Sequence, residues 1–334
     1  MAVGRIGNPS YKQVAVGRIG NPSYKQVAYQ IRTLATVPPT GEEAIMASSL
    51  PMTGKTCLIT GATSGIGLVT AHELARMGAR VLLVGRDRAR TEAAITAIRT
   101  QTGSTAVESF LADLSSQAQV RSLAEQVRQR HHRLDVLLNN AGGMWLERRL
   151  TVDGLEMTFA VNHLAYFLLT SLLLDVLKQN GPARIVNVAS AAHRGATIDF
   201  DNLNGERGYG GWRQYCRTKL MNILFTYELA RRLTGTSVTA NALHPGWVAT
   251  GFGGANGWRG RLWQGFASLL ALRPDTGART PIYLASAPEV AGVSGRYFVK
   301  KRAVASSPAS YDEETARRLW QVSEQLTSGA PLAR

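Results

Sequence analysis

Short apolar runs alternate with longer amphipathic segments from Lys55 onward. Runs rich in Val, Ile, Leu and Thr are typical of buried strands, and apolar positions at helical spacing predict helices. We expect strands at residues 56–60, 80–84, 106–111, 134–139, 184–189, 238–243 and 296–299, and helices at 66–77, 87–101, 117–130, 152–178 and 213–233. This alternation predicts an α/β fold with a doubly wound, mostly parallel sheet and helices on both faces.

The first 45 residues do not follow this alternation. Residues 2–14 read AVGRIGNPSYKQV, and residues 15–27 repeat them letter for letter. Two copies are too few for a solenoid, and a stretch rich in Gly, Asn, Pro and Ser favours disorder. We therefore expect residues 1–45 to form a disordered or loosely attached arm, and residues 46–334 to form a single domain.

A glycine-rich turn lies between the first predicted strand and the first predicted helix, and residues 60–67 read TGATSGIG. Glycines let the backbone approach a pyrophosphate, and the amides that begin a helix attract an anion. A plain surface turn is the alternative, but the strand–turn–helix context favours a Rossmann-type dinucleotide site. The residues of the turn expected to bind the cofactor are Gly61, Thr63, Ser64, Gly65, Ile66 and Gly67.

The residues after the second predicted strand bear on which dinucleotide binds. Arg86 comes first, and Asp87 follows it. A guanidinium group suits the 2′-phosphate of NADP, whereas a carboxylate at this place binds the ribose hydroxyls of NAD. We favour NADP(H); Asp87 leaves NAD(H) open unless that residue caps the next helix.

Two further strand ends carry candidate cofactor residues. Asp113 and Leu114 follow the third strand, where a carboxylate can bind an adenine amino group or cap the next helix. Asn140, Ala141 and Gly142 follow the fourth strand, where small residues allow a ligand to approach closely. An ordinary Asn–Gly turn explains this second segment equally well.

The candidate catalytic chemistry lies later in the chain. Tyr215 and Lys219 stand four residues apart, on one face of a predicted helix. A neighbouring ammonium and a bound nicotinamide cation both favour the phenolate, so this tyrosine can exchange a proton nearer neutral pH. Ser190 ends the fifth strand, where its hydroxyl can hold a substrate oxygen. Asn162 is a fourth polar candidate, because it lies inside an otherwise apolar helix.

Together these motifs resemble those of the short-chain dehydrogenase/reductase family, over about residues 53–326. The glycine turn, the segment Asn139–Gly142, the four polar residues above and Pro245–Gly246 occur in the order typical of that family. Within the family the chain is most similar to the retinol-dehydrogenase-like branch. The segments that carry this similarity are residues 186–193, 199–204, 215–222, 248–250, 294–297 and 317–320.

The resemblance implies a role for each matching residue. Tyr215 would be the general acid/base, Lys219 would lower its pKa and hold the nicotinamide ribose, Ser190 would polarise the substrate oxygen, and Asn162 would carry a water in a proton relay. Asn140 and Gly142 would lie near the adenosine-side ribose, and Asp113 and Leu114 near the adenine. The residues that would contact the nicotinamide half are Pro245, Gly246, Val248 and Thr250.

The substrate pocket is less defined by the sequence. Residues 251–272 begin with several glycines and continue as an amphipathic segment, which indicates a lid. Arg259 and Arg261 would allow peripheral membrane contact through this lid, and a lid packed on its own domain is the alternative. Five side chains are considered for an apolar pocket, and each can instead belong to the core: Met144, Trp145, His193, Trp212 and Trp247.

Composition narrows the class of protein further. The net charge is +15 over 334 residues, yet no block of five basic residues occurs, which favours a solvated basic surface over a nucleic-acid site. Two cysteines cannot form a disulfide framework, the first residues lack the apolar core of a signal peptide, and no unbroken apolar run reaches about 18 residues. We expect a cytoplasmic, metal-free oxidoreductase acting on a small hydrophobic alcohol or carbonyl compound, as a monomer or homo-oligomer. A non-catalytic NADP(H)-binding redox sensor is the alternative.

Overall fold

The computed structural model describes residues 50–179, 181–246 and 274–328. The predicted arm at residues 1–45 and the predicted lid at about 251–272 lie outside these residues. The described chain forms one eight-stranded sheet with the order β3-β2-β1-β4-β5-β6-β7-β8. All neighbouring strands are parallel except β7 and β8, so the predicted mostly parallel, doubly wound sheet is confirmed.

All but the last of the described strands match the predicted segments to within two residues, and the last was not predicted. They are β1 (Thr56–Thr60), β2 (Arg80–Gly85), β3 (Val107–Leu111), β4 (Val136–Asn139), β5 (Ala183–Val188), β6 (Val238–His244), β7 (Arg296–Val299) and β8 (Arg302–Val304). The longer helices are α2 (Gly65–Arg76), α3 (Arg88–Thr102), α4 (Gln117–Arg130), α6 (Ala165–Gln179), α7 (Gly211–Arg232), α9 (Pro274–Ser286) and α10 (Glu313–Thr327).

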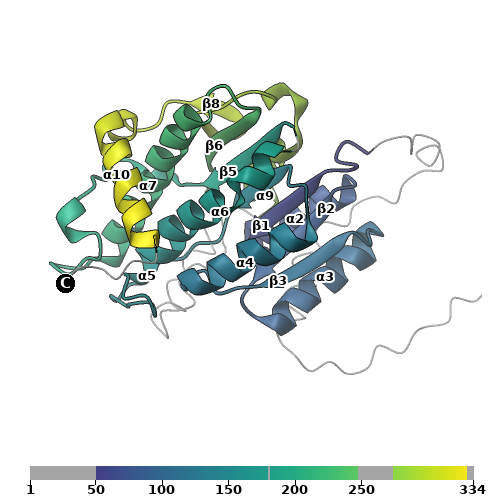
Figure 1. Ribbon diagram of the computed structural model, residues 1–334, viewed down its shortest axis with the longest axis horizontal. Coiled ribbons are helices and arrows are strands. Elements are labelled where there is room, and N and C mark those ends of the chain that lie inside the picture. Colours follow the sequence, from purple (N-terminus) through teal and green to yellow (C-terminus); the bar gives the residue numbers. More distant parts are fainter. Residues whose placement is uncertain (1–49, 180, 247–273, 329–334) are drawn as a thin grey trace, which may run out of the picture.

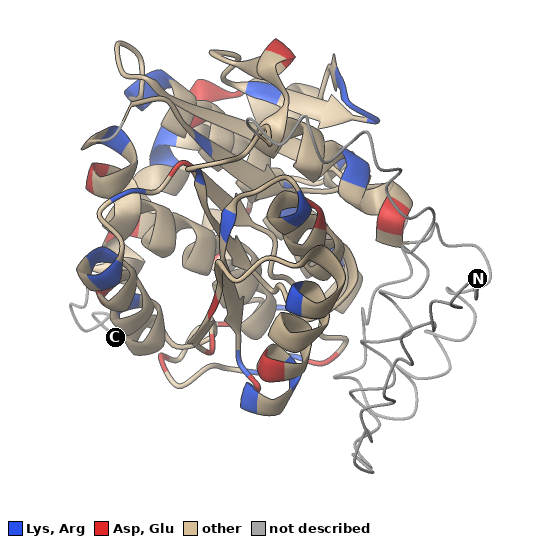
Figure 2. Ribbon diagram, turned by 90° about the vertical axis from the view of Figure 1, so that its right-hand side faces the viewer, with Lys and Arg blue, Asp and Glu red and all other residues tan. Residues whose placement is uncertain are grey.

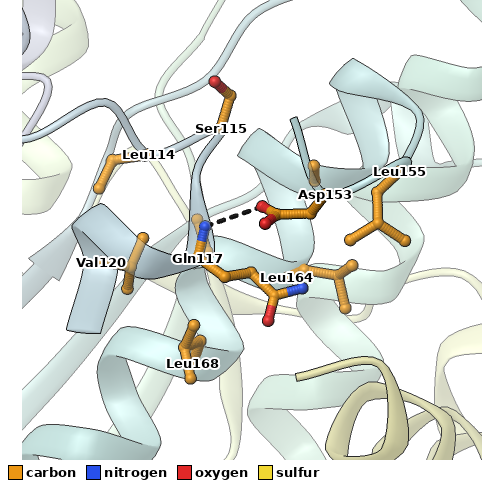
Figure 3. Close-up of a pocket in the computed structure, with 10 residues that line it drawn as sticks. Leu114, Ser115, Gln117, Val120, Asp153, Leu155, Leu164 and Leu168 are labelled. Carbon is orange, nitrogen blue, oxygen red and sulfur yellow. Dashed lines mark hydrogen bonds between the residues drawn. The ribbon is translucent and has the colours of Figure 1, made fainter. Parts of the chain in front are cut away.

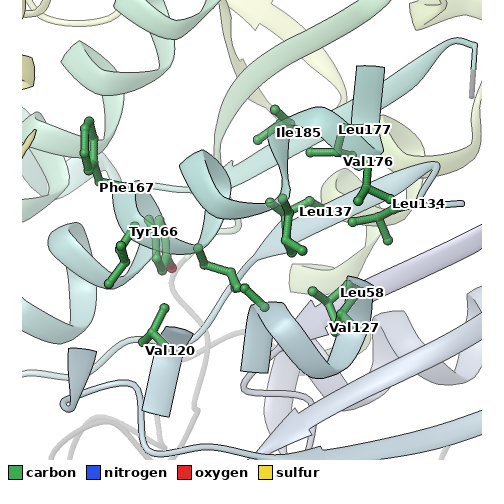
Figure 4. Packing of buried hydrophobic residues seen from close by; sticks show 14 of the residues in the cluster. Leu58, Val120, Val127, Leu134, Leu137, Tyr166, Phe167, Val176, Leu177 and Ile185 are labelled. Carbon is green, nitrogen blue, oxygen red and sulfur yellow. The ribbon is translucent and has the colours of Figure 1, made fainter. Parts of the chain in front are cut away.

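Helices cover both faces of the sheet (Figure 1). One face carries α4, α6 and α7, and the other carries α2, α3 and α9. Strand residues alternate between the two cores: Leu58, Leu137 and Ile185 point toward the first, as Figure 4 shows, and Ile59 and Leu138 point toward the second. Burial on both faces explains why these strands read as continuous apolar runs.

The C-terminal helix α10 lies across α7 and beside α6 (Figure 1). Its Trp320 packs edge-on against Phe167 of α6 and stacks on Phe225 of α7, with ring centroids 5.0 and 5.8 Å away. Neither α10 nor α9 was among the predicted elements. Helix α9 begins at Pro274 and contains Pro281, which obscures its pattern, and α10 is polar on its outer side.

The helix predicted at residues 152–178 begins later and is not regular throughout. It consists of α5 (Met157–Phe159), a π-helical turn at Ala160–Leu164 (η1) and α6. The span Met157–Gln179 is the one described helix that is long and apolar enough to cross a membrane, although most of it is buried in the fold. No unbroken apolar run marks this span in the sequence, because Asn162 and His163 interrupt it.

The charged side chains are distributed over many elements, with basic and acidic residues interspersed (Figure 2). Several of them form surface ion pairs, among them Arg80 with Glu108 at 2.9 Å and Arg317 with Glu313 at 3.3 Å. Such pairs are typical of a solvated face. Both cysteines are free: Cys57 is buried in β1, and Cys216 is half-buried in α7.

Candidate active site

The candidate residues meet at the carboxyl edge of the sheet. Strands β1, β4, β5 and β6 are consecutive neighbours and run in the same direction. The glycine turn, Asn140, Ser190 and Pro245 come directly after these four strands. Parallel strands therefore bring together residues that lie more than 180 positions apart in the sequence, at the edge where open α/β sheets bind their ligands.

The glycine turn is fastened to the end of β4. The side-chain amide of Asn140 donates to the carbonyl oxygens of Thr60 (2.8 Å) and Gly61 (3.3 Å). The hydroxyl of Thr60 in turn accepts from the backbone amides of Asn140 (2.9 Å) and Ala141 (3.0 Å). A Cβ atom on Gly67 would lie 2.5 Å from both Asn140 Nδ2 and the Gly61 carbonyl oxygen. Only glycine fits there, which gives the turn its tight form.

The start of α2 suits an anion. Its N-cap residue, Ser64, makes no side-chain capping hydrogen bond, and the first turn of the helix contains no acidic residue. The partial positive charge of the helix N-terminus therefore faces the turn without a carboxylate from its own first turn. The backbone cradle and this helix start fit the pyrophosphate of a dinucleotide.

The two residues after β2 differ in what they contact. Asp87 is the N-cap of α3, and its carboxylate accepts from the Arg90 backbone amide at 2.8 Å. Arg86 is exposed, and no ion pair involves it within the residues that the structure describes. The carboxylate is thus already engaged in capping, while the guanidinium group remains available to a ligand.

The segment after β3 is held mainly by local bonds. The Asp113 carboxylate accepts from the backbone amide (2.9 Å) and hydroxyl (2.8 Å) of Ser115, and Ser116 caps α4. Leu114 and Ser115 line the small hollow of Figure 3, where Gln117 N donates to Asp153 at 2.9 Å. Apolar side chains fill most of this hollow, and the candidate catalytic residues lie elsewhere.

Tyr215, Ser190 and Lys219 come together at the end of β5. The Ser190 side chain lies near the Tyr215 phenol and favours its charged form. The ammonium of Lys219 lies 5.5 Å from the centroid of the Tyr215 ring and donates to the Val188 carbonyl oxygen at 3.0 Å. Tyr215 and Lys219 are buried, at 8% and 3% exposure, because α7 packs them against the sheet.

Asn162 connects the π-helical turn to this group. Its side chain accepts from Gly143 N (2.8 Å) and donates to Gly143 O (2.9 Å) and to the Thr218 hydroxyl (3.1 Å). A Cβ atom on Gly142 would lie 3.2 Å from Asn162 Oδ1 and 3.6 Å from Lys219 Nζ. Gly142, expected near the adenosine-side ribose, therefore lies beside the catalytic candidates.

Burial governs the titration of the two central groups. It raises the pKa of Tyr215 above its usual range, an effect that the nearby Ser190 side chain opposes. It also lowers the pKa of Lys219 to about 7. The sequence prediction relied on a bound nicotinamide cation as well as an ammonium; in the protein alone, desolvation of the phenol dominates its pKa.

The His193 side chain binds the backbone carbonyl of Ser190. The imidazole Nδ1 lies 2.6 Å from the Ser190 carbonyl oxygen, and the Ser307 backbone amide donates to Nε2 at 3.0 Å. These partners require a neutral ring with its proton on Nδ1. Burial lowers the pKa of His193, which favours this neutral form. His193 was considered for the substrate pocket, but it is fully buried with both ring nitrogens bound to backbone.

The other pocket candidates lie around the start of α7. The Trp212 ring is 51% exposed and 5.7 Å from the Tyr215 ring. Met144 and Trp145 are buried, and the Trp145 carbonyl accepts from the Tyr209 hydroxyl at 2.7 Å. Pro245 and Gly246 are half-buried directly after β6. The remaining candidates lie outside the described residues: Trp247, Val248 and Thr250.

A row of buried side-chain hydrogen bonds beneath the site was not predicted from the sequence. Asn139 Nδ2 donates to Thr170 Oγ1 (3.0 Å) and to Asn187 Oδ1 (2.8 Å), and Asn187 donates to Thr226 Oγ1 at 3.0 Å. These four residues come from α6, β4, β5 and α7 and are 0–1% exposed. The signal was available, because an asparagine inside a buried strand needs a partner on a neighbouring element.

Sequence reasoning also missed Glu156, which is fully buried before α5. Its carboxylate accepts from the backbone amides of Thr158 (2.9 Å) and Phe159 (2.8 Å). It also accepts from Tyr209 Oη and Gln214 Nε2, both at 3.0 Å. This carboxylate ties the loop before α7 to the helix that carries Asn162, and its partners come from segments too far apart for a local pattern to reveal them.

Comparison with known proteins gives consistent matches. The family model described as short chain dehydrogenase matches residues 55–257. Human retinol dehydrogenase 13 is 45% identical over 293 residues, which cover 86% of this chain and 88% of that protein.

Two solved structures also match. The crystal structure of an uncharacterised protein from Mycobacterium paratuberculosis has a TM-score of 0.69 at 37% identity and covers 84% of this chain and 97% of that one. A structure from Beutenbergia cavernae, described as that of an NAD(P)-dependent gluconate 5-dehydrogenase by assignment and holding NADP at low occupancy, has a TM-score of 0.59 at 26% identity and covers 75% of this chain and 97% of that one.

Proposed function

Since the chain belongs to the short-chain dehydrogenase family, we propose that it is an NADP(H)-dependent oxidoreductase that interconverts hydrophobic alcohols and aldehydes or ketones. The observation that carries this proposal is the convergence of Tyr215, Ser190 and Lys219 beside a tight glycine turn. A phenol, a hydroxyl and an amine at one buried point are the groups needed to manage the proton of a carbonyl reduction.

In the proposed reaction, hydride transfer is the chemistry that the nicotinamide group supplies. The side chains of this protein move the proton and fix the oxygen. During reduction, Tyr215 gives its phenolic proton to the oxygen that becomes the alcohol; during oxidation, the phenolate takes it back. Ser190 donates a hydrogen bond to the same oxygen, where negative charge develops. When Lys219 is protonated, its ammonium stabilises the Tyr215 phenolate, because the two side chains lie close together.

We infer a preference for NADP(H) from the end of β2. Arg86 is exposed there, whereas Asp87 is engaged as the N-cap of α3. The Arg86 guanidinium group can bind a 2′-phosphate. The Asp87 carboxylate is engaged in capping α3 and does not strongly repel that phosphate. The gluconate 5-dehydrogenase at 26% identity, which was solved with NADP, is compatible with this preference.

Arg86→Ala is expected to raise the Michaelis constant for NADPH by about 10- to 100-fold, the range of one charge-assisted hydrogen bond, and to leave that for NADH almost unchanged. Arg88→Ala is the matched control, because Arg88 is also exposed and only pairs with Glu92 at 3.8 Å. Initial rates with both cofactors measure the effect. If the NADPH constant of Arg86→Ala stays within twofold of the wild-type value, the 2′-phosphate binds elsewhere.

We propose apolar substrates because the exposed Trp212 ring lies next to Tyr215, and the backbone of buried Trp145 lies against Gly211, the residue before Trp212. The similarity to retinol dehydrogenases supports the same class. The test is NADPH consumption by the purified protein with all-trans-retinal, octanal and an aromatic ketone as probes. Turnover of at least one supports the proposal. Tight NADPH binding without turnover of any probe would favour the alternative, a redox sensor.

The sensor alternative explains the site less well. A protein that only binds the cofactor has no need for a buried phenol close to both a serine and a lysine. A cytoplasmic location, peripheral membrane contact through residues 251–272 and the number of subunits stay predictions from the sequence.

A further inference from the structure

One buried carboxylate anchors the segment that leads into α7. Glu156 is fully buried, and one of its oxygens lies 3.0 Å from Tyr209 Oη while the other lies 3.0 Å from Gln214 Nε2. The backbone amides of Thr158 and Phe159 donate to the same two oxygens, at 2.9 and 2.8 Å. Four donors therefore fix the orientation of this carboxylate, and two of them belong to residues 209–214.

The Tyr209 hydroxyl connects this carboxylate to the segment that follows β4. It lies 2.7 Å from the Trp145 carbonyl oxygen, so its one proton is shared between that carbonyl and the carboxylate. The two backbones also touch: a Cβ atom on Gly211 would lie 2.3 Å from the Trp145 carbonyl oxygen and 2.7 Å from the Leu146 Cα. The first turn of α7 is thus in direct contact with residues 145–146, and Tyr209 joins the two.

Two exposed apolar side chains belong to these touching segments. Leu146 is 42% exposed, and Trp212, on the first turn of α7, is 51% exposed. Adjoining apolar side chains that remain on the surface are typical of a place where an apolar group binds. The Trp212 ring lies 5.7 Å from the Tyr215 ring, so this surface adjoins the group that we propose exchanges a proton with the substrate.

The Trp145 ring is held separately from its carbonyl group. A Cβ atom on Gly143 would lie 2.8 Å from two atoms of this ring, and Asn162 binds both the amide and the carbonyl oxygen of Gly143. Loss of the Tyr209 hydrogen bond would therefore leave the ring in place beside Asn162. What it would release is the backbone that carries Leu146.

We propose that Glu156, acting through Tyr209 and Gln214, is a positioning residue for substrate binding. It holds Leu146 and Trp212 together as the surface that takes the hydrocarbon chain of the substrate. A surface that is already ordered binds a chain more tightly, since less conformational entropy is lost on binding. The inference rests on the proposed function, because it assigns the apolar part of that substrate to a particular surface.

Two substitutions release the two sides of this surface. Tyr209→Phe removes the hydroxyl that joins Glu156 to Trp145 and keeps the ring. Gln214→Met keeps an unbranched side chain of similar length but removes the donor to Glu156 and to the Leu203 carbonyl oxygen. Each variant nearly preserves the volume of the side chain, so neither leaves a large cavity.

The readout is kcat/KM for NADPH-dependent reduction of straight-chain aldehydes from propanal to octanal. In the wild-type protein this value should rise with chain length, by up to about fourfold for each methylene group that becomes buried. Tyr283→Phe is the matched control and should keep this dependence, because Tyr283 is also half-buried and lies on α9, at the opposite face of the sheet.

The two variants should bind long substrates less well and short ones almost normally. In Tyr209→Phe and Gln214→Met, kcat/KM for octanal should fall by about 10-fold, the range of one hydrogen bond to a charged group, and that for propanal by less than about twofold. The loss should appear in KM and not in kcat, because these hydrogen bonds order the binding surface and take no part in the proton transfer.

A role in folding alone gives a different result. It would lower kcat/KM by the same factor for propanal and octanal in both variants, and that outcome overturns the inference. So does a wild-type protein whose kcat/KM does not change with chain length, because the surface of Leu146 and Trp212 would then bind something other than substrate, such as a second subunit or a lipid.

The proposed function and this inference can fail separately. If the wild-type protein reduces none of the aldehydes, the proposed function is wrong for this substrate class. Titration calorimetry of the NADPH complex with propanol and octanol then tests the surface, and equal octanol binding by the wild-type protein and Tyr209→Phe contradicts the inference. If octanal is reduced and Tyr215→Phe is inactive, but both variants keep the wild-type dependence on chain length, the proposed function stands and only the role of Glu156 is wrong.

Discussion

Replacing Tyr215 by phenylalanine is expected to abolish carbonyl reduction while the protein still binds NADPH. The substitution removes a single hydroxyl and keeps the ring that packs beside Trp212. Without the phenol no described group at this point can deliver a proton directly: the Lys219 ammonium donates to Val188, and Ser190 is only a weak acid. General acid catalysis contributes about 10²- to 10⁴-fold, so kcat should fall by about three orders of magnitude.

The measurement is single-turnover and steady-state NADPH oxidation with an apolar aldehyde, together with the NADPH dissociation constant from tryptophan fluorescence. Tyr283→Phe is a suitable control, because that tyrosine lies on α9, on the opposite face of the sheet, where its side chain packs against the core and its ring lies 5.9 Å from the Lys301 ammonium. A Tyr215→Phe protein that keeps more than a tenth of the wild-type kcat would assign the proton to another residue.

Strands β1 to β7 could be predicted to within two residues because most of them are buried runs of apolar residues. Thr56–Thr60 and Arg296–Val299 agree with their predicted segments at both ends. The elements that were not predicted differ in the strength of their pattern. Strand β8 has three residues and is exposed throughout, so it gives no periodic signal. The buried residues of α10, which include Ala316, Leu319 and Trp320, recur at helical spacing, so the signal for this helix was available in the sequence.

The residues that form the site could be predicted, because parallel strands end at one edge of the sheet and the residues directly after each strand can be read from the sequence. The partners of these residues could not be predicted. His193 binds the Ser190 carbonyl and the Ser307 amide, which lie on segments more than 100 residues apart. Such contacts depend on how loops return to the sheet, and no local pattern records that path.

The burial of Tyr215 was not part of the sequence prediction either, which relied on a neighbouring ammonium together with a bound nicotinamide cation to favour the phenolate. The Tyr–Lys spacing gives the right proximity, yet α7 removes both groups from water, which disfavours the charged form of each. Lys219, with a pKa lowered to about 7, is only partly protonated at neutral pH in the protein alone. An additional positive charge, such as an oxidised nicotinamide, is needed to favour the phenolate.

Replacing Gly67 by alanine is expected to eliminate cofactor binding and therefore activity. The new Cβ would lie 2.5 Å from the Gly61 carbonyl oxygen and from Asn140 Nδ2, well inside van der Waals contact. The carbonyl is backbone and cannot turn aside, so the turn must open and break the Asn140 bonds to Thr60 and Gly61. Overpacking of this kind costs about 1–3 kcal/mol in stability.

We expect the NADPH dissociation constant of Gly67→Ala to rise by more than about 100-fold, because the pyrophosphate loses the close approach of the backbone and the aligned start of α2. Gly210→Ala is the control, since a Cβ there meets only atoms of Arg213, at 3.7 Å or more. Fluorescence titration gives the constants, and circular dichroism confirms that both variants are folded. A folded Gly67→Ala protein that binds NADPH within twofold of the wild-type constant would show that the nucleotide lies away from this turn, and the site built around it would have to be abandoned.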